Sequence, residues 1–292
     1  MRVSEQQLFG QLARAVAAGW ARLARVQRQV ATGVRVASPA DDPVAAARVG
    51  ALDETLRRLD QADAAARSAT ASLEASEAAL GEANSLVIRA RELAVQAASE
   101  QYSAADRAAV ADEVQALRQQ MLALANTEVG GSYLFAGARN DQVAFDAAGN
   151  YQGDANEPEL EVAPGLRVAV VLSGDRVFGA AGGTDVLATL DNLQQALNAD
   201  DTAAIQSSLD QLDAAGRQLV SARAEAGARL ELVAAAGGWC GRLRNGVLTD
   251  RGRVRDTDLA GASMQLALAQ KALEAAVASV AKVVEPDLLG RL

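Results

Sequence analysis

The chain has 292 residues, of which half are apolar but only 3% aromatic, and 37 acidic against 28 basic residues give a net charge of −9. It contains no histidine, which excludes an imidazole base. It contains one cysteine, Cys240, so an internal disulfide and a cysteine-rich metal site are excluded as well. The acidic balance argues against nucleic-acid binding, and the lack of a run of about 20 apolar residues argues against membrane insertion.

An N-terminal helix is predicted over residues 4–32, where apolar residues recur at spacings of three and four and form a heptad seam on one face. Gly33 follows as the stop signal. Residues 1–40 carry six arginines against one acidic residue, so the helix is basic and lacks the apolar core of a cleaved signal peptide. The predicted seam consists of Phe9, Leu12, Val16, Leu23, Val26 and Val30.

A short turn follows, with two prolines around a pair of aspartates: Ser38, Pro39, Ala40, Asp41, Asp42 and Pro43. Pro39 excludes a continuous helix here, and Pro43 suits the first position of a new one. Asp42 is then the natural N-cap, accepting a hydrogen bond from an unpaired backbone N–H. A catalytic carboxylate pair is the alternative interpretation of Asp41 and Asp42, and the turn and cap are the simpler one.

A long helix is predicted over residues 43–100, because large apolar residues repeat every seven positions from Leu52 to Ala94, with small residues three positions later. Ser103 and Asp106 resemble a capping box that opens a second helix over 103–128. The two helices form an antiparallel hairpin around 99–103, and we expect their seams to pack within the chain.

The pattern changes at residue 130. Segments 159–162 and 166–172 have strand character and are joined by the turn Ala163-Pro164-Gly165, so 130–183 is predicted to be a small β-rich inserted domain. An enzyme site could lie only in this insert. Its acidic residues are more simply solvated loop residues: Asp154, Glu157, Glu159 and Asp175.

Helices are predicted again over 184–199 and 202–236, followed by a Gly-rich linker that starts at Gly237–Gly241, and by a last helix over 263–284. The fold is therefore predicted as mainly α with a small β-rich inserted domain, in which N- and C-terminal segments build a long antiparallel coiled-coil rod. Its segments are 1–40, 41–129, 130–183, 184–254 and 255–292. The C-terminal seam consists of Leu266, Leu273, Val277, Val280 and Val284, and then Leu288, Leu289 and Leu292.

Several segments resemble the flagellin superfamily. Residues 29–47, which include Ser38-Pro39-Ala40-Asp41-Asp42-Pro43-Val44-Ala45-Ala46, are similar to its N-terminal signature, in the form typical of hook–filament junction proteins. Segments 133–137 (YLFAG), 151–154 (YQGD), 258–262 (DLAGA) and 288–292 (LLGRL) resemble further family motifs in the expected order.

This resemblance implies a structural, non-enzymatic component of the bacterial flagellum that needs no cofactor. Such proteins are exported unfolded by the flagellar type III pathway without a cleaved signal, and form an adaptor ring outside the cell. The implied partners are other copies of the chain, an adjacent hook-associated protein, flagellin and an export chaperone at the C-terminal helix.

The seams of the two terminal helices can pack within one chain or between subunits. We expect packing between subunits, with residues 1–40 and 255–292 flexible in the isolated subunit. Two alternatives stay open: a flagellin filament subunit, and an intracellular coiled-coil scaffold or organellar protein whose Arg-rich N-terminus is a transit peptide.

Overall fold

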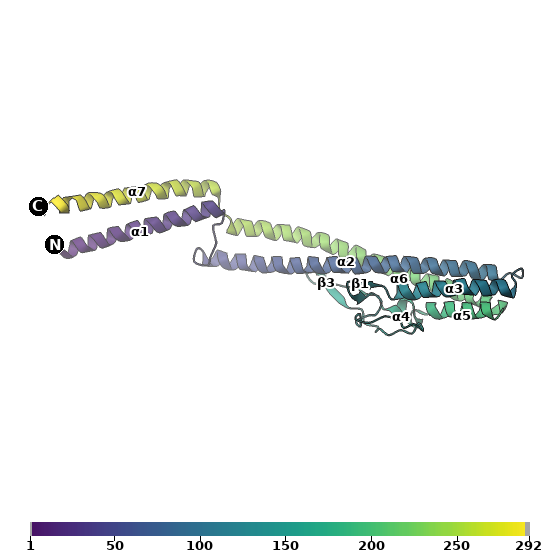
Figure 1. Ribbon diagram of the computed structural model, residues 1–292. Helices are drawn as coiled ribbons and strands as arrows, with labels where there is room; N and C mark the ends of the chain where they lie inside the picture. Colours follow the sequence, from purple (N-terminus) through teal and green to yellow (C-terminus); the bar gives the residue numbers. More distant parts are fainter. Residues whose placement is uncertain (1, 290–292) are drawn as a thin grey trace. The chain divides into compact units, whose positions relative to one another are not determined.

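The computed structural model describes the backbone of residues 2–289, and the side-chain surroundings of residue 7 and of residues 10–281. The chain divides into two units, one formed by residues 1–57 and 244–292 and the other by residues 58–243. Most of the described residues are helical (Figure 1). This confirms the predicted class, mainly α with a small strand-containing insert.

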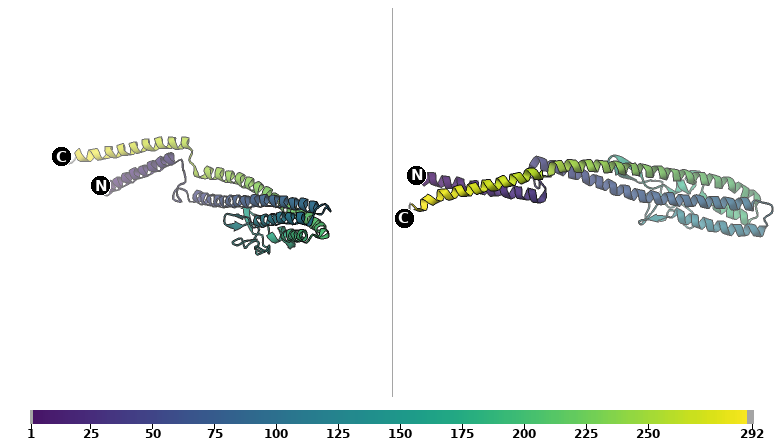
Figure 2. Two further views of the ribbon diagram at one scale, coloured as in Figure 1. Left: turned by 45° about the vertical axis from the view of Figure 1, so that its right-hand side comes forward. Right: turned by 90° about the horizontal axis from the view of Figure 1, so that it is seen from above.

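In the first unit, helix α1 (Arg2–Thr32) lies antiparallel beside helix α7 (Leu259–Leu289), as all three views show (Figure 1, Figure 2). The two ends of the chain therefore meet, as their seams predict. Leu23, Ala269 and Leu273 form a small buried cluster between the helices. Gly19 lets them approach closely, since a Cβ there would lie 3.1 Å from Leu273 Cδ1.

Helix α2 (Pro43–Ala97) and helix α6 (Thr202–Arg255) each contribute residues to both units. In the second unit they pack with α3 (Ala104–Ala125) and α5 (Val186–Asn198). The predicted heptad seam is buried from Leu59 to Ala94, and Leu73 and Leu80 are completely inaccessible to solvent. Each buried leucine contributes roughly 2 kcal/mol by removing apolar surface from water.

The turns at one end of these helices are joined by Arg107, whose side chain is buried. Its guanidinium donates to the carbonyls of Ala97, at 2.8 Å, and Ser99, at 3.0 Å, and it forms an ion pair with Asp200. The predicted capping box precedes it, since Ser103 Oγ accepts from the Asp106 N–H while the Asp106 carboxylate accepts from the Ser103 N–H.

The insert contains two small antiparallel sheets, β1 (Glu128–Val129) with β2 (Ser132–Tyr133), and β3 (Glu159–Ala163) with β4 (Leu166–Ala169). The sequence predicts the β3–β4 hairpin but not β1–β2. A short helix α4 (Gly174–Val177) and a 3₁₀ turn η1 (Ala180–Gly182) follow. Phe135 and Phe178 pack edge to face in its core, with ring centroids 5.1 Å apart.

The predicted Gly-rich linker is wrong, because α6 continues without interruption through Gly237–Gly241 to Arg255. The reason is tertiary packing. Val233, Ala236 and Cys240 are buried and extend the heptad seam across the glycines. Each glycine lowers helix stability by only about 1 kcal/mol relative to alanine, and burial of the seam residues offsets this loss.

Helix α7 starts four residues before the predicted 263–284 and ends five residues after it. No helix in the described part of the chain has an apolar stretch long enough to span a bilayer.

Candidate functional site: the assembly surfaces of the helices

The seam residues of α1 and α7 differ in how far they are covered within the chain. Leu23, Val26 and Leu273 are buried, while Val277 is 48% exposed. The intermediate group comprises Leu12, Val16, Val30, Leu266 and Val280. Leu292 lies outside the described residues, and so do the side chains of Phe9, Val284, Leu288 and Leu289. Pairing within one chain thus covers the centre of the seam and leaves part of it accessible.

Other apolar side chains of the two helices lie outside the seam and are exposed, with Trp20 at 58%, Met264 at 65% and Leu268 at 61%. The heptad pattern selects one stripe for each helix, so it misses these residues. The i, i+4 spacing of Met264 and Leu268 is the signal that could have revealed a second stripe. The helix pair therefore offers apolar surface on more than one side.

The proline-flanked turn is held by its two aspartates. The Asp42 carboxylate accepts from the Ala45 N–H at 3.0 Å, which is N-cap geometry, and Pro43 is the first residue of α2. This backbone hydrogen bond, with a further one from Arg35, lowers the pKa of Asp42. Asp41 accepts from the N–H and hydroxyl of Ser38, and these bonds lower its pKa as well. Pro39 is exposed in the same turn.

The same turn is bonded to the segment between α6 and α7. The Arg35 N–H donates to the Arg255 carbonyl at 2.8 Å, and the Thr257 N–H donates to the Gly33 carbonyl at 2.9 Å. The Arg35 guanidinium also donates to the Val254 carbonyl at 2.7 Å. The helix breaks at 33–42 and 256–258 are therefore tied together by backbone hydrogen bonds.

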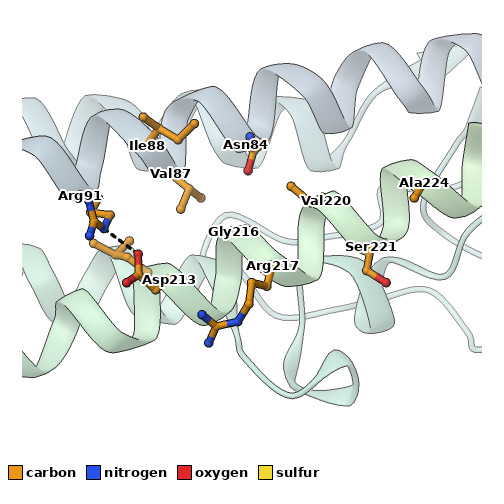
Figure 3. Close-up of a pocket in the computed structure, with 11 residues that line it drawn as sticks. Asn84, Val87, Ile88, Arg91, Asp213, Gly216, Arg217, Val220, Ser221 and Ala224 are labelled. Atoms are coloured by element: carbon orange, nitrogen blue, oxygen red, sulfur yellow. Dashed lines mark ion pairs between the residues drawn. The ribbon is translucent and has the colours of Figure 1, made fainter.

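A groove of about 500 Å³ lies between α2 and α6 in the second unit (Figure 3). Gly216 forms part of its floor, and Ile88 and Val220 at its sides are half exposed. At one end Arg91 pairs with Asp213 at 2.6 Å. The lining is mostly apolar and its carboxylate is already paired, so the groove suits packing against another surface better than acid–base chemistry.

The YLFAG and YQGD segments meet in the insert, where glycine is required by space. A Cβ on Gly153 would lie 2.5 Å from the Ala136 carbonyl oxygen, and one on Gly174 would lie 2.6 Å from that of Phe135. Tyr151 Oη donates to the Asp154 carbonyl at 2.7 Å. These motifs are therefore packing determinants of the insert.

Two of the acidic residues that could have marked an enzyme site have structural partners. Asp154 accepts from the Ala138 N–H at 2.8 Å. Glu157 pairs with Arg176 at 2.7 Å and with Arg229 at 2.6 Å, and the second bond connects the insert to α6. Glu159 is exposed.

Among the described residues, no group of three or more His, Cys, Asp or Glu side chains is arranged to hold a metal ion. Cys240 is buried, and burial raises the pKa of its thiol. A buried protonated thiol is a poor nucleophile.

Comparison with known proteins agrees with the superfamily resemblance. Residues 3–140 match the family of the bacterial flagellin N-terminal helical region. The chain is 31% identical to flagellar hook-associated protein 3 of Escherichia coli (strain K12) over 254 residues, covering 79% of this chain and 80% of that protein. It is 30% identical to flagellar hook-associated protein 3 of Salmonella typhimurium, covering 62% of this chain and 57% of that one.

The fold is similar to that of a solved structure described as a putative flagellar hook-associated protein from Vibrio parahaemolyticus, with a TM-score of 0.68 and 20% identity. The match covers 74% of this chain and all of the other. The chain therefore belongs to the family of flagellar hook-associated protein 3, a family of structural proteins of the bacterial flagellum.

Proposed function

We propose that this chain is a non-enzymatic structural subunit that joins the flagellar hook to the flagellin filament as part of a ring of identical copies. The observation that carries the proposal is the paired terminal helices, which expose Trp20, Met264 and Leu268 together with part of the seam. Apolar side chains spaced along rigid helices favour packing against neighbouring subunits, and each buried Å² contributes roughly 25 cal/mol.

The neighbours in this proposal are other copies of the chain, an adjacent hook-associated protein and flagellin. Family membership supports these partners, and the exposed α1–α7 pair supplies surface for them. The proposed subunit interface includes the seam residues as predicted from the sequence. Contact areas that are each weak become strong in a closed ring, because every subunit is then held by two neighbours.

Export precedes assembly in this proposal. The chain leaves the cell through the flagellar type III pathway without cleavage, and an export chaperone covers α7 until then. Support comes from the exposed Met264, Leu268 and Val277 on this helix, since an apolar stripe of this kind promotes aggregation unless it is covered.

The test is deletion of the gene in its host, followed by electron microscopy of the flagella and measurement of secreted flagellin. We expect hooks without filaments and flagellin in the medium, both reversed by the wild-type gene. Normal filaments would contradict the junction role and favour an intracellular scaffold. Intact hooks with extracellular junction proteins but no flagellin would instead identify a filament subunit.

A further inference from the structure

Charge is distributed unequally between the two units. Residues 58–243 contain 26 acidic and 13 basic residues, a net charge of −13, whereas the remaining residues contain 11 acidic and 15 basic residues, a net charge of +4. The acidic unit keeps many of its own arginines in ion pairs, among them Arg89, Arg91 and Arg223. The charge of each unit is thus complementary to that of the other.

Three of the basic residues of the first unit lie on one side of α1. Arg14, Arg25 and Arg28 each follow a seam residue by two positions, namely Leu12, Leu23 and Val26. Two positions correspond to about 200° around a helix, so these arginines lie on the side opposite α7. We call this surface the arginine face and include in it the exposed alanines between the arginines, Ala17, Ala21 and Ala24.

The arginine face is shaped to receive a partner. Between its side chains lies a shallow hollow of about 550 Å³, lined by Ala21, Ala24, Arg25, Gln27, Arg28 and Ala31. The small alanines let another helix approach closely, and exposed Trp20 borders the face beside Ala17 and Ala24. Within the part of the chain that the structure describes, neither Arg25 nor Arg28 forms an ion pair, although the Arg28 charge acts on Asp41 and helps to lower the pKa of that carboxyl group.

From this we propose that the arginine face binds the acidic helical surface of residues 58–243 in a second copy of this chain. The inference rests on the ring proposed above, which brings copies side by side. The contact is heterologous, since a basic surface on one copy meets an acidic surface on the next, and such contacts give a ring when the rotation between copies closes and an open helical array when it does not. Four exposed acidic residues of the described helices that have no ion pair there are candidates for the contact: Glu74, Glu82, Asp112 and Asp210.

The first test is sedimentation of the purified full-length chain at about 50 mM and about 500 mM salt. We expect self-association at low salt that weakens at high salt. Arg25→Glu with Arg28→Glu should weaken it at least about tenfold. The matched control, Arg22→Glu with Arg48→Glu, changes the net charge equally at exposed positions outside the face and should retain association.

A chain that stays monomeric at low salt, or equal weakening by both double variants, would overturn the proposal. Binding to phosphatidylglycerol vesicles or to a single-stranded oligonucleotide, lost only in the Arg25→Glu, Arg28→Glu variant and without self-association, would assign the face to an anionic lipid or nucleic acid instead.

A second test uses assembled flagella. A photo-crosslinking residue at Ala21 should yield a dimer of this chain whose cross-linked peptide lies within 58–243. Cross-linking to flagellin or hook protein would overturn the inference and leave the junction role standing. If the wild-type gene failed to restore filaments, the junction role would fail, while the sedimentation result would still decide the inference.

Discussion

Arg229 and Glu157 are 72 residues apart in the sequence, yet Arg229 Nη2 donates to Glu157 Oε2 at 2.6 Å. Both side chains are mostly buried, at 15% and 19% exposure, and the bond connects the insert to α6. Glu225 and Arg176 extend it to a network of four charged residues. The insert is therefore fixed to the helices by charged hydrogen bonds as well as by its aromatic core.

Glu157→Gln should lower the free energy of unfolding by about 2 kcal/mol, because hydrogen bonds between charged groups are lost while Arg229 stays mostly buried. Urea unfolding followed by circular dichroism measures the change. Glu159→Gln, an exposed neighbour, is the matched control and should have little effect. Equal stability of the two variants would show that the network contributes nothing.

The same network predicts a pH dependence. Burial raises the pKa of Glu157, but bonds from Arg229 and Ser173 outweigh it, so the pKa lies below the ordinary 4.5. The pKa of Glu225 is lowered as well: burial raises it, but the hydrogen bond from Arg176 and the charges of Arg229 and Arg176 outweigh this effect. A lowered native pKa contributes stability that is present above about pH 4.5 and lost as the pH falls below it. Unfolding free energies measured from about pH 6 to about pH 3 should decrease, and less steeply in Glu157→Gln.

Gly174→Ala should destabilise the insert by about 3 kcal/mol, because the added Cβ would lie 2.6 Å from the Phe135 carbonyl oxygen and 2.9 Å from the Phe145 and Tyr151 rings. Gly227→Ala is the matched control. Gly227 lies in α6 with open space where a Cβ would be, so this variant should have a free energy of unfolding about 1 kcal/mol higher than the wild-type chain. Thermal unfolding of both variants decides the matter, and a stable Gly174→Ala protein would show that the insert relaxes freely.

Gly237→Ala combined with Gly241→Ala tests the continuity of α6. Neither added methyl group meets another atom within 4 Å, so the double variant should gain about 1–2 kcal/mol and keep its helical content. Hydrogen exchange should show protected amides at 237–241 in the wild-type chain. Fast exchange there, together with no gain in stability, would indicate a linker.

How far the sequence predicts this structure depends on whether a signal is local. Leu73 and Leu80 recur at a strict interval, so their burial follows from the heptad alone. Gly237 and Gly241 predict a helix break because helix propensity is a local property. The helix is kept intact by the burial of Ala236 and Cys240, which depends on residues far away in the sequence. The Arg229–Glu157 bond has no local signal, since nothing near either residue in the sequence indicates the other.

The assembly surface divides in the same way. The seam positions Leu23 and Leu273 follow from periodicity, and the structure pairs them within one chain. Whether the seam also contacts other subunits stays a prediction. The arginine face is visible in the sequence only as a basic stretch, because the free side of α1 is known only once α7 is seen to cover the other.

The discontinuity of the first unit has a consequence for the order in which the chain folds. Synthesis produces α1 first and α7 last, and residues 58–243 are complete before α7 exists. Leu23 and Leu273 are about 250 residues apart, so their contact can form only after α7 has been made. The contiguous unit can fold without α1 and α7, whereas the terminal pair forms only as a final step. Any factor that binds α1 or α7 during this interval would compete with the chain's own last folding event.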